Sequence, residues 1–246
     1  MKLLAQFGKY CLFIASMFRN REKFGVYVSR VLDECMLIGI DSVFIVVIVS
    51  TFIGAVVALQ TVYNLVSPLI PLTIVGVLVR DTTVLELAPT VICIVLSGKV
   101  GSNIAGGLGT MRITEQIDAL EVMGINSSSY LVLPKIVAAL ITFPMLVILA
   151  TFLSIYGGYL SSTLSGMVTP TEYIYGIRQD FNPANVRFAL IKAFVFAFLI
   201  ASISAFQGYY TRGGALEVGQ SSTKAVTNSC ISVLLADYLL AQLLLL

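Results

Sequence analysis

The sequence of 246 residues contains no histidine and few charged residues. Only 11% of the residues are Asp, Glu, Lys or Arg, whereas soluble proteins average about 25%. The hydrophobic fraction is 58%, and the mean hydropathy is +0.96. Because so few charges cannot cover a water-facing surface, the composition predicts an integral membrane protein. The length predicts a single domain over residues 1–246.

Several kinds of site are excluded by what is missing. Without histidine there is no zinc or haem ligation through His, and none of the four cysteines forms a CxxC pair, so we expect no metal site and no disulfide framework. No basic stripe interleaved with aromatics suggests nucleic acid as a partner. A Walker A motif is also missing, because Val100 follows Gly98-Lys99 and Cys93 occupies the position of its first glycine. We therefore expect no ATP hydrolysis and no enzymatic activity in this chain itself.

Five apolar segments are long enough to cross a membrane, whose hydrocarbon core of about 30 Å takes about 20 helical residues. They are residues 43–66, 82–108, 136–160, 188–210 and 225–246. Residues 69–79 are also apolar, which leaves the start of the second segment open. In residues 1–18 apolar side chains recur every three or four positions, which is typical of a helix lying in the membrane interface. We predict an all-α membrane protein, with residues 1–41 as an interfacial or cytoplasmic helical region and residues 42–246 as a core of five transmembrane helices.

Lys and Arg are unevenly distributed around these segments. Most of them lie in residues 1–41 and in the connections between the second and third and between the fourth and fifth segments. Because cytoplasmic loops carry the excess of Lys and Arg, we predict a cytoplasmic N-terminus and a C-terminus on the opposite side. Residues 109–124, between the second and third segments, are therefore expected to face the cytoplasm.

That connection, GTMRITEQIDALEVMG, is a charged segment in an apolar chain. On a helical projection of residues 112–123, apolar side chains gather on one side and acidic side chains lie on or beside the other. Thr114 is a candidate cap for the first turn, and Gly124 is a candidate left-handed stop. We predict a short amphipathic helix with two possible roles, a solvated connector or a docking helix for a cytoplasmic partner. Its charged residues are Arg112, Glu115, Asp118 and Glu121.

Small residues dominate the sequence just before this helix. In SGKVGSNIAGGLGT they recur every four positions along two adjacent rows. Such rows allow helices to approach closely, so we predict tight helix packing there. The first row is Ser97, Gly101, Ala105 and Gly109, and the second is Gly98, Ser102, Gly106 and Thr110.

The stretch SGKVGSNIAGGLGTMRITEQIDALEVMG, followed by YLVLPK, resembles the signature of the MlaE permease family. FIGAVVALQ (residues 52–60) and GYYTRGGALEVGQSSTKAV (residues 208–226) are similar to other parts of that family, so the resemblance covers roughly residues 40–246. Members are the membrane subunits of ABC transporters. They move phospholipid between the bacterial inner and outer membranes and so maintain outer-membrane lipid asymmetry.

The resemblance implies a homodimer in the bacterial inner membrane, each subunit having one interfacial helix and five spans. It implies a cytoplasmic dimer of ABC ATPases that carries ATP and Mg²⁺, so this chain needs no cofactor of its own. It also implies a periplasmic MCE-domain lipid-binding protein and, in some systems, a STAS-domain subunit. By the same resemblance EQIDALEVM is the coupling helix. Its ATPase contacts would be Arg112, Glu115, Asp118 and Glu121.

Ionisable residues inside a membrane segment are candidates for function. In LELAPT (residues 85–90), Glu86 and Pro89 match the family pattern RELGPV, whereas Leu85 replaces its arginine. The resemblance implies that Glu86 is a polar wall of the lipid cavity near the dimer axis. Arg80 is a candidate substitute for the missing arginine.

An alternative for Glu86 is a buried glutamate bonded to Thr82, Thr83 or a neighbouring helix. Gln60 matches another family position near the same cavity. Tyr63 is a weaker cavity candidate, because tyrosines at the membrane interface usually belong to an aromatic belt.

Two further charges lie deep in the last two segments. Measured from the outer end at a rise of about 1.5 Å per residue, Lys192 lies about 7.5 Å deep and Asp237 about 13.5 Å deep. A lysine side chain can reach across that difference, so we predict an intramembrane ion pair with a structural role. Removing one of its charges should destabilise the chain more than removing both.

The sequence favours a phospholipid permease over two alternatives. An intramembrane lipid-modifying enzyme would need clustered acids for a metal, or a nucleophile with a base. A secondary transporter would usually show inverted repeats and broken helices at the midplane. Neither pattern is found in the sequence.

Overall fold

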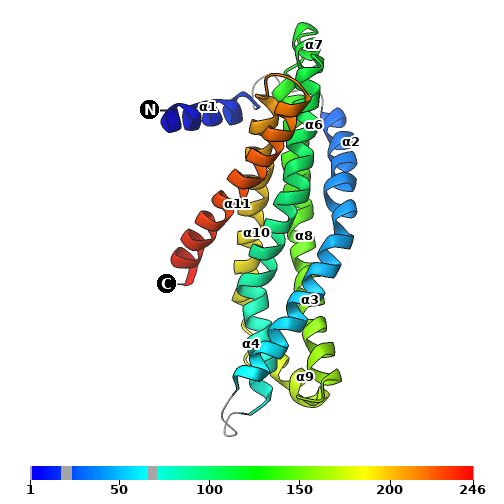
Figure 1. Ribbon diagram of the computed structural model, residues 1–246, viewed down its shortest axis with the longest axis vertical. Helices are drawn as coiled ribbons and strands as arrows, with labels where there is room; N and C mark the ends of the chain where they lie inside the picture. Colours follow the sequence, from blue (N-terminus) through cyan, green and yellow to red (C-terminus); the bar gives the residue numbers. More distant parts are fainter. Residues whose placement is uncertain (1, 18–23, 66–70, 246) are drawn as a thin grey trace. The chain divides into compact units, whose positions relative to one another are not determined.

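A computed structural model describes residues 2–17, 24–65 and 71–245, and this part of the chain is helical without a strand. As predicted, five of its helices are long and apolar enough to cross a membrane (Figure 1). They are Tyr27–Asn64, Thr73–Ile113, Ser127–Leu164, Pro183–Tyr209 and Ala215–Leu243. The individual elements are α1 (Lys2–Ser16), α2 (Phe24–Cys35), α3 (Asp41–Asn64), α4 (Thr73–Thr82), α5 (Ile92–Leu96), α6 (Ser102–Ile113), α7 (Gln116–Val122), α8 (Ser127–Leu164), α9 (Pro170–Arg178), α10 (Pro183–Tyr209) and α11 (Ala215–Leu245), with the π-helical segments η1 (Met36–Ile40), η2 (Thr83–Val91) and η3 (Ser97–Gly101).

The first two spanning helices begin earlier than their predicted apolar segments. α2, η1 and α3 follow one another without a break, so part of the region predicted as interfacial or cytoplasmic belongs to the first spanning helix. The second helix begins at Thr73, which settles the start that the sequence left open. The predicted end of the first segment, at residue 66, and the last residue of the fifth, 246, lie outside the described residues.

The chain divides into two compact units. Unit 1 comprises Met1–Ser42, Ile94–Phe143 and Val195–Leu239, and unit 2 comprises Val43–Cys93, Pro144–Phe194 and Leu240–Leu246. The helices α8 and α10 each contribute one part to each unit.

In unit 1, aromatic side chains pack α1 against the C-terminal half of α10. Phe13 is buried, and its ring centroid lies 5.7 Å from that of Phe206 and 5.1 Å from that of Tyr209. The hydroxyls of Tyr10 and Ser202 are hydrogen-bonded at 2.7 Å, and burial raises the pKa of Tyr10. Within this unit, α1 extends sideways from the long helices (Figure 1). Its location in a membrane interface stays a prediction.

In unit 2, glycines bring the backbones of α3 and α8 into direct contact. A Cβ atom on Gly54 would lie 1.8 Å from the carbonyl oxygen of Ser154, and one on Gly157 would lie 2.2 Å from that of Thr51. The Ser154 hydroxyl also donates to the Ser50 carbonyl at 2.8 Å. Rows of small residues in the sequence do not predict this contact, because here one glycine on each helix faces the backbone of the other.

A short helix, α9, lies between the third and fourth spanning helices. It begins with a capping box, in which Thr169 and Glu172 exchange side-chain and backbone hydrogen bonds. The bonds from the Thr169 hydroxyl and backbone N–H lower the pKa of Glu172. Tyr173 is buried and donates its hydroxyl proton to the Ile155 carbonyl at 3.1 Å, so α9 is anchored to α8 within unit 2.

Candidate functional site

The charged segment forms an elbow, which corrects the prediction of one helix over residues 112–123. α6 runs on into the segment, Thr114 ends it, and Glu115 has a left-handed backbone (φ 58°) before α7 begins. The Thr114 hydroxyl donates to the Thr110 carbonyl at 2.8 Å, so Thr114 closes α6 and does not cap α7. Gly124 has φ 79° and ends α7 in the left-handed region, as predicted.

Side-chain contacts hold this elbow in one shape. Arg112 Nη1 lies 2.7 Å from Asp118 Oδ1, which joins α6 to α7 across the bend. Glu121 Oε1 accepts hydrogen bonds from the hydroxyls of Ser127 at 2.8 Å and Tyr209 at 3.0 Å. An exposed ion pair contributes at most about 1 kcal/mol, but these bonds together tie α7 to α6, α8 and α10 within unit 1. Arg112 and Glu121 are predicted to contact a partner, but in this structure their side chains stabilise the elbow through contacts within the chain.

Along α7 and at both of its ends, carboxylates and apolar side chains are exposed together. Glu115 is exposed and makes no ion pair within the described part of the chain. Val122 is 89% exposed and Met123 is 66% exposed, while Ile117 is fully buried. We call Glu115, Asp118, Val122 and Met123 the α7 tip. Its two apolar members, Val122 and Met123, do not stand out in the sequence, because the whole chain is rich in apolar residues.

The first small-residue row makes the predicted close contacts. Cβ atoms on Gly101 and Gly109 would lie 2.9 Å and 3.2 Å from side-chain atoms of unit 1, and the Ala105 carbonyl lies 2.5 Å from the place of a Cβ on Gly208. Gly98, in the second row, differs from the prediction, because no described atom outside its own helical turn lies within 4 Å of its Cβ position. Since η3 is a π-helix, these rows do not follow a regular α-helical projection.

In unit 2, Glu86 and Lys192 form an ion pair that joins two spanning helices. Lys192 Nζ lies 2.8 Å from Glu86 Oε2; the lysine side chain is fully buried and the glutamate side chain is 47% exposed. The Thr90 hydroxyl donates to Glu86 Oε1 at 3.2 Å. Among the partners of Glu86 are thus Thr90 of its own segment and Lys192 of a neighbouring helix, and the second is a contact that the alternative for Glu86 included. The carboxylate is the accessible end of the pair.

Lys192 also reaches the backbone beside Glu86, in the π-helical segment η2 that contains Pro89. The carbonyl that it reaches is that of Leu85. Lys192 Nζ lies 3.3 Å from that carbonyl oxygen and donates to it. One ammonium group therefore neutralises Glu86 and satisfies the carbonyl beside it. Although Leu85 replaces the family's arginine, a positive charge is still present here, supplied by α10.

Arg80 does not take the role of that missing arginine. Its side chain is 3% exposed and pairs with the neighbouring Asp81 at 2.8 Å. Its Nη1 donates to the backbone carbonyls of Ile177 at 2.8 Å and Gln179 at 2.5 Å. Carbonyl groups at a helix C-terminus attract cations, so Arg80 stabilises the end of α9 and is not free to bind a phosphate.

The other residues predicted from the sequence occupy three places. Gln60 and Tyr63 lie near the end of α3 in unit 2, and both are exposed, Tyr63 to 86%. Asp237 belongs to α11 in unit 1, whereas Lys192 belongs to unit 2. The ion pair between Lys192 and Asp237 therefore stays a prediction, and the pairing of Lys192 with Glu86 is a contact that the sequence did not predict.

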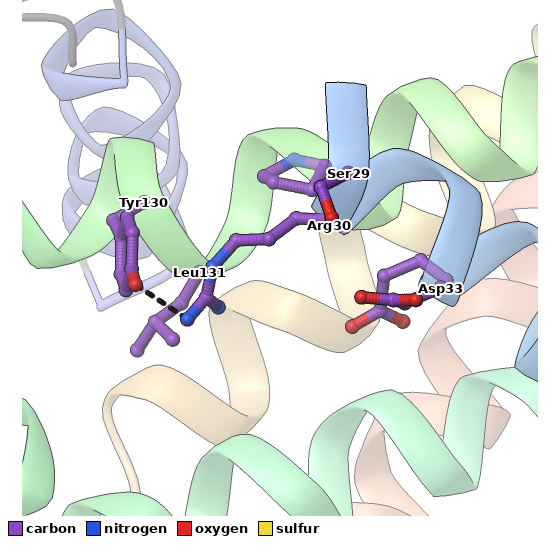
Figure 2. A pocket seen from close by; sticks show the side chains of 7 residues that line it. Ser29, Arg30, Asp33, Tyr130 and Leu131 are labelled. Carbon is purple, nitrogen blue, oxygen red and sulfur yellow. Dashed lines mark hydrogen bonds between the residues drawn. The ribbon is translucent and has the colours of Figure 1, made fainter. Parts of the chain in front are cut away.

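A polar cleft of about 520 Å³ lies between α2 and α8 in unit 1. Figure 2 shows Arg30 reaching from α2 to the Tyr130 ring, whose hydroxyl accepts a hydrogen bond from it at 2.5 Å. The guanidinium carbon lies 3.7 Å from the ring centroid, while Asp33 lies away from this contact. Lys135 pairs with Glu34 nearby. These contacts give Arg30 and Glu34 of α2 partners on α8, which lets the first helix extend beyond its apolar run.

Comparison with known proteins adds independent information. The profile of the family described as Permease MlaE matches residues 31–243. A probable ABC transporter permease protein of Rickettsia bellii is 35% identical over 98% of this chain and 93% of its own length. A similarly named protein of Synechocystis sp. is 33% identical over 87% of this chain and 81% of its own length. The protein TRIGALACTOSYLDIACYLGLYCEROL 1, chloroplastic, of Arabidopsis thaliana is 31% identical over 88% of this chain and 62% of its own length.

Proposed function

Because the chain belongs to the MlaE permease family, we propose that it forms the membrane part of an ABC transporter whose cargo is phospholipid. Family membership makes the chain a permease, and its five long apolar helices indicate a multi-pass membrane protein. Lipid as the cargo is supported by the Arabidopsis relative, which is named after a diacylglycerol lipid. The proposed setting is the bacterial inner membrane, with the N-terminus in the cytoplasm and the C-terminus in the periplasm.

The α7 tip is the proposed docking site for a cytoplasmic ABC ATPase, and this surface carries the proposal. Val122 and Met123 are exposed beside the carboxylates of Glu115 and Asp118. Such a mixture of apolar contact and charge suits a protein partner that offers an apolar groove with basic or donor groups at its rim. The predicted topology places this tip on the cytoplasmic side.

The elbow is suited to transmit a displacement. A packed element with few alternative arrangements passes on a shift that a slack loop would absorb. α6 is the end of a helix that is continuous from Thr73 to Ile113, and the bonds of Arg112 and Glu121 hold α7 to its neighbours. In the proposed mechanism, ATP and Mg²⁺ act on the partner. Closure of the ATPases shifts a two-state equilibrium of the permease without chemistry in this chain.

The proposed transporter contains two copies of this chain around a lipid cavity. It further contains a dimer of ATPases, a periplasmic MCE-domain lipid-binding protein and, in some systems, a STAS-domain subunit. Glu86 is the proposed polar wall of the cavity. Its half-exposed carboxylate, held by Thr90 and Lys192, would meet a lipid head group more favourably than an acyl chain, because an apolar chain cannot solvate a charge.

Co-purification from detergent tests the docking site. The double reversal Glu115→Lys with Asp118→Lys is expected to abolish recovery of the ATPase with the tagged chain. Glu115→Gly separates the charge from the backbone, because glycine keeps the left-handed elbow at no steric cost; it removes one of the two carboxylates and should reduce recovery of the ATPase. Asp180→Lys, an exposed acid outside the elbow, is the matched charge control. Full recovery of the ATPase with the double reversal would refute the proposed docking site.

A further inference from the structure

A second groove lies in unit 1, where α1 crosses α10 and α11. Its volume is about 670 Å³, within the range of about 300–1,000 Å³ that is common for small-ligand sites. The hydrogen bond between Tyr10 and Ser202 and the packing of Phe13 keep α1 in place beside it. The lining residues are Lys9, Tyr10, Leu199, Ile203, Phe206, Gln207, Tyr210, Arg212, Asn228, Ile231 and Ser232.

The groove is amphipathic in composition. Apolar and aromatic side chains such as Ile203, Phe206 and Ile231 form much of its wall. Lys9 and Arg212 are both exposed, and neither makes an ion pair with any described residue. The described residues that line the groove include no carboxylate. Two cations without counter-ions thus share one apolar groove.

A neighbouring hollow extends the positive charge. It shares Arg212 with the groove and adds Lys224 and Glu217. The Glu217 carboxylate accepts a hydrogen bond from the Gly214 backbone N–H at 2.8 Å, so it serves the start of α11. Three cations and one carboxylate leave a net positive surface at this end of the groove.

We propose that this groove binds one anionic phospholipid, with its phosphate at Lys9 and Arg212 and an acyl chain along Ile203, Phe206 and Ile231. On the predicted topology the cations face the cytoplasmic leaflet, whose anionic lipids attract basic residues. A second copy of this chain is a less suitable occupant, because it would have to bury both cations with no carboxylate in the groove to pair them. The lipid is a resident of the permease, separate from the proposed cargo, and its binding requires no ATPase.

Lipid titration of the purified full-length chain in detergent, followed by native mass spectrometry, tests this site. Phosphatidylglycerol is expected to bind more tightly than phosphatidylcholine, and glycerol phosphate, which has no acyl chain, should not compete. Lys9→Gln with Arg212→Gln should weaken phosphatidylglycerol about 25-fold, since each basic residue near an anionic lipid contributes about fivefold. Arg178→Gln, an exposed cation in unit 2, is the matched control and should leave binding unchanged.

A second variant tests the acyl-chain part of the groove. Ile231→Trp fills the groove at an exposed position and leaves both cations in place, so phosphatidylglycerol should bind more weakly while the chain still folds. Equal binding of the two lipids, or undiminished binding to the Lys9/Arg212 double variant, would overturn the proposal. So would a double variant that loses self-association and keeps its lipid, since the groove would then be a contact between copies. None of these results depends on transport, so the lipid site and the proposed transporter can fail separately.

Discussion

Replacing Glu86 by leucine is expected to destabilise the chain more than replacing Lys192 by methionine, although the two residues form one ion pair. The reason is the unequal burial of the partners. The Lys192 side chain is fully buried, whereas the Glu86 side chain is 47% exposed. Glu86→Leu leaves a buried ammonium without this counter-ion, while Lys192→Met leaves a carboxylate that remains accessible and keeps its bond from Thr90.

The magnitudes follow from the geometry. Unit charges at the observed 2.8 Å attract each other by about 6 kcal/mol at an effective dielectric constant of about 20, and desolvation of the lysine opposes much of this gain. Unpairing a buried charge costs about 3–5 kcal/mol. We expect about 3 kcal/mol for Glu86→Leu, because the ammonium keeps the Leu85 carbonyl, and about 1 kcal/mol for Lys192→Met. The double variant should be close to wild type, because neither charge is left unpaired.

Thermal unfolding in detergent, followed by circular dichroism, measures this order. A change of 1 kcal/mol shifts the Tm of a chain of this size by about 2–4 °C. Glu86→Leu should therefore lower the Tm by about 6–12 °C and Lys192→Met by about 2–4 °C, with the double variant within about 2 °C of wild type. A double variant as unstable as Glu86→Leu alone would refute the reasoning. Asp237→Leu belongs in the same series, because Asp237 is the other predicted partner of the Lys192 ammonium group. If the two residues are paired, Asp237→Leu should lower the Tm, and adding Lys192→Met to it should lower the Tm no further.

Two more predictions concern helix packing, at Gly54 in unit 2 and at Gly98 in unit 1, and a third concerns the capping box of α9. Gly54→Ala should destabilise by about 3 kcal/mol, the upper end for overpacking, because its Cβ would lie 1.8 Å from the Ser154 carbonyl oxygen. Gly98→Ala, where the described chain leaves the space open, should instead stabilise by about 0.5–1 kcal/mol, and equal Tm changes for the two would contradict the packing argument. The lowered pKa of Glu172 means that the capping box stabilises α9 above the ordinary glutamate pKa of 4.5 and is lost as the pH falls through the lowered value. Backbone amides in the first turn of α9 should then exchange faster relative to their intrinsic rates, and Glu172→Gln should remove this pH dependence.

Much of the architecture could be predicted because hydropathy reports helix length directly. Five spanning helices and the left-handed stop at Gly124 follow from local sequence. The start of the first spanning helix could not be placed from the sequence. Arg30 and Glu34 are charged residues that precede its apolar run, and only their partners on α8 show that the helix includes them. Likewise, the residues around Glu115 do not predict its left-handed backbone. The projection of residues 112–123 assumes one helix that begins at residue 112, whereas α6 continues to Ile113 and α7 begins at Gln116.

The candidate sites were predictable by residue type more than by partner. Glu86 and Lys192 stand out as charges in apolar segments, but their pairing depends on a tertiary contact, in which the ammonium group also reaches the Leu85 carbonyl. Arg80 was assigned to the cavity from its spacing to Leu85, yet the carbonyls at the end of α9 bind it. Spacing along one helix cannot show what another helix offers.

The direct contact of α3 with α8 restricts how unit 2 can move. Where two backbones touch through Gly54 and Gly157, no side chain lies between them that could change rotamer and absorb a shift. We therefore expect α3 and α8 to move together as one rigid unit rather than to slide past each other. A displacement within unit 2 must be taken up where the backbone is freer, and Gly166, which follows α8 in the left-handed region that glycine adopts at no steric cost, is such a place.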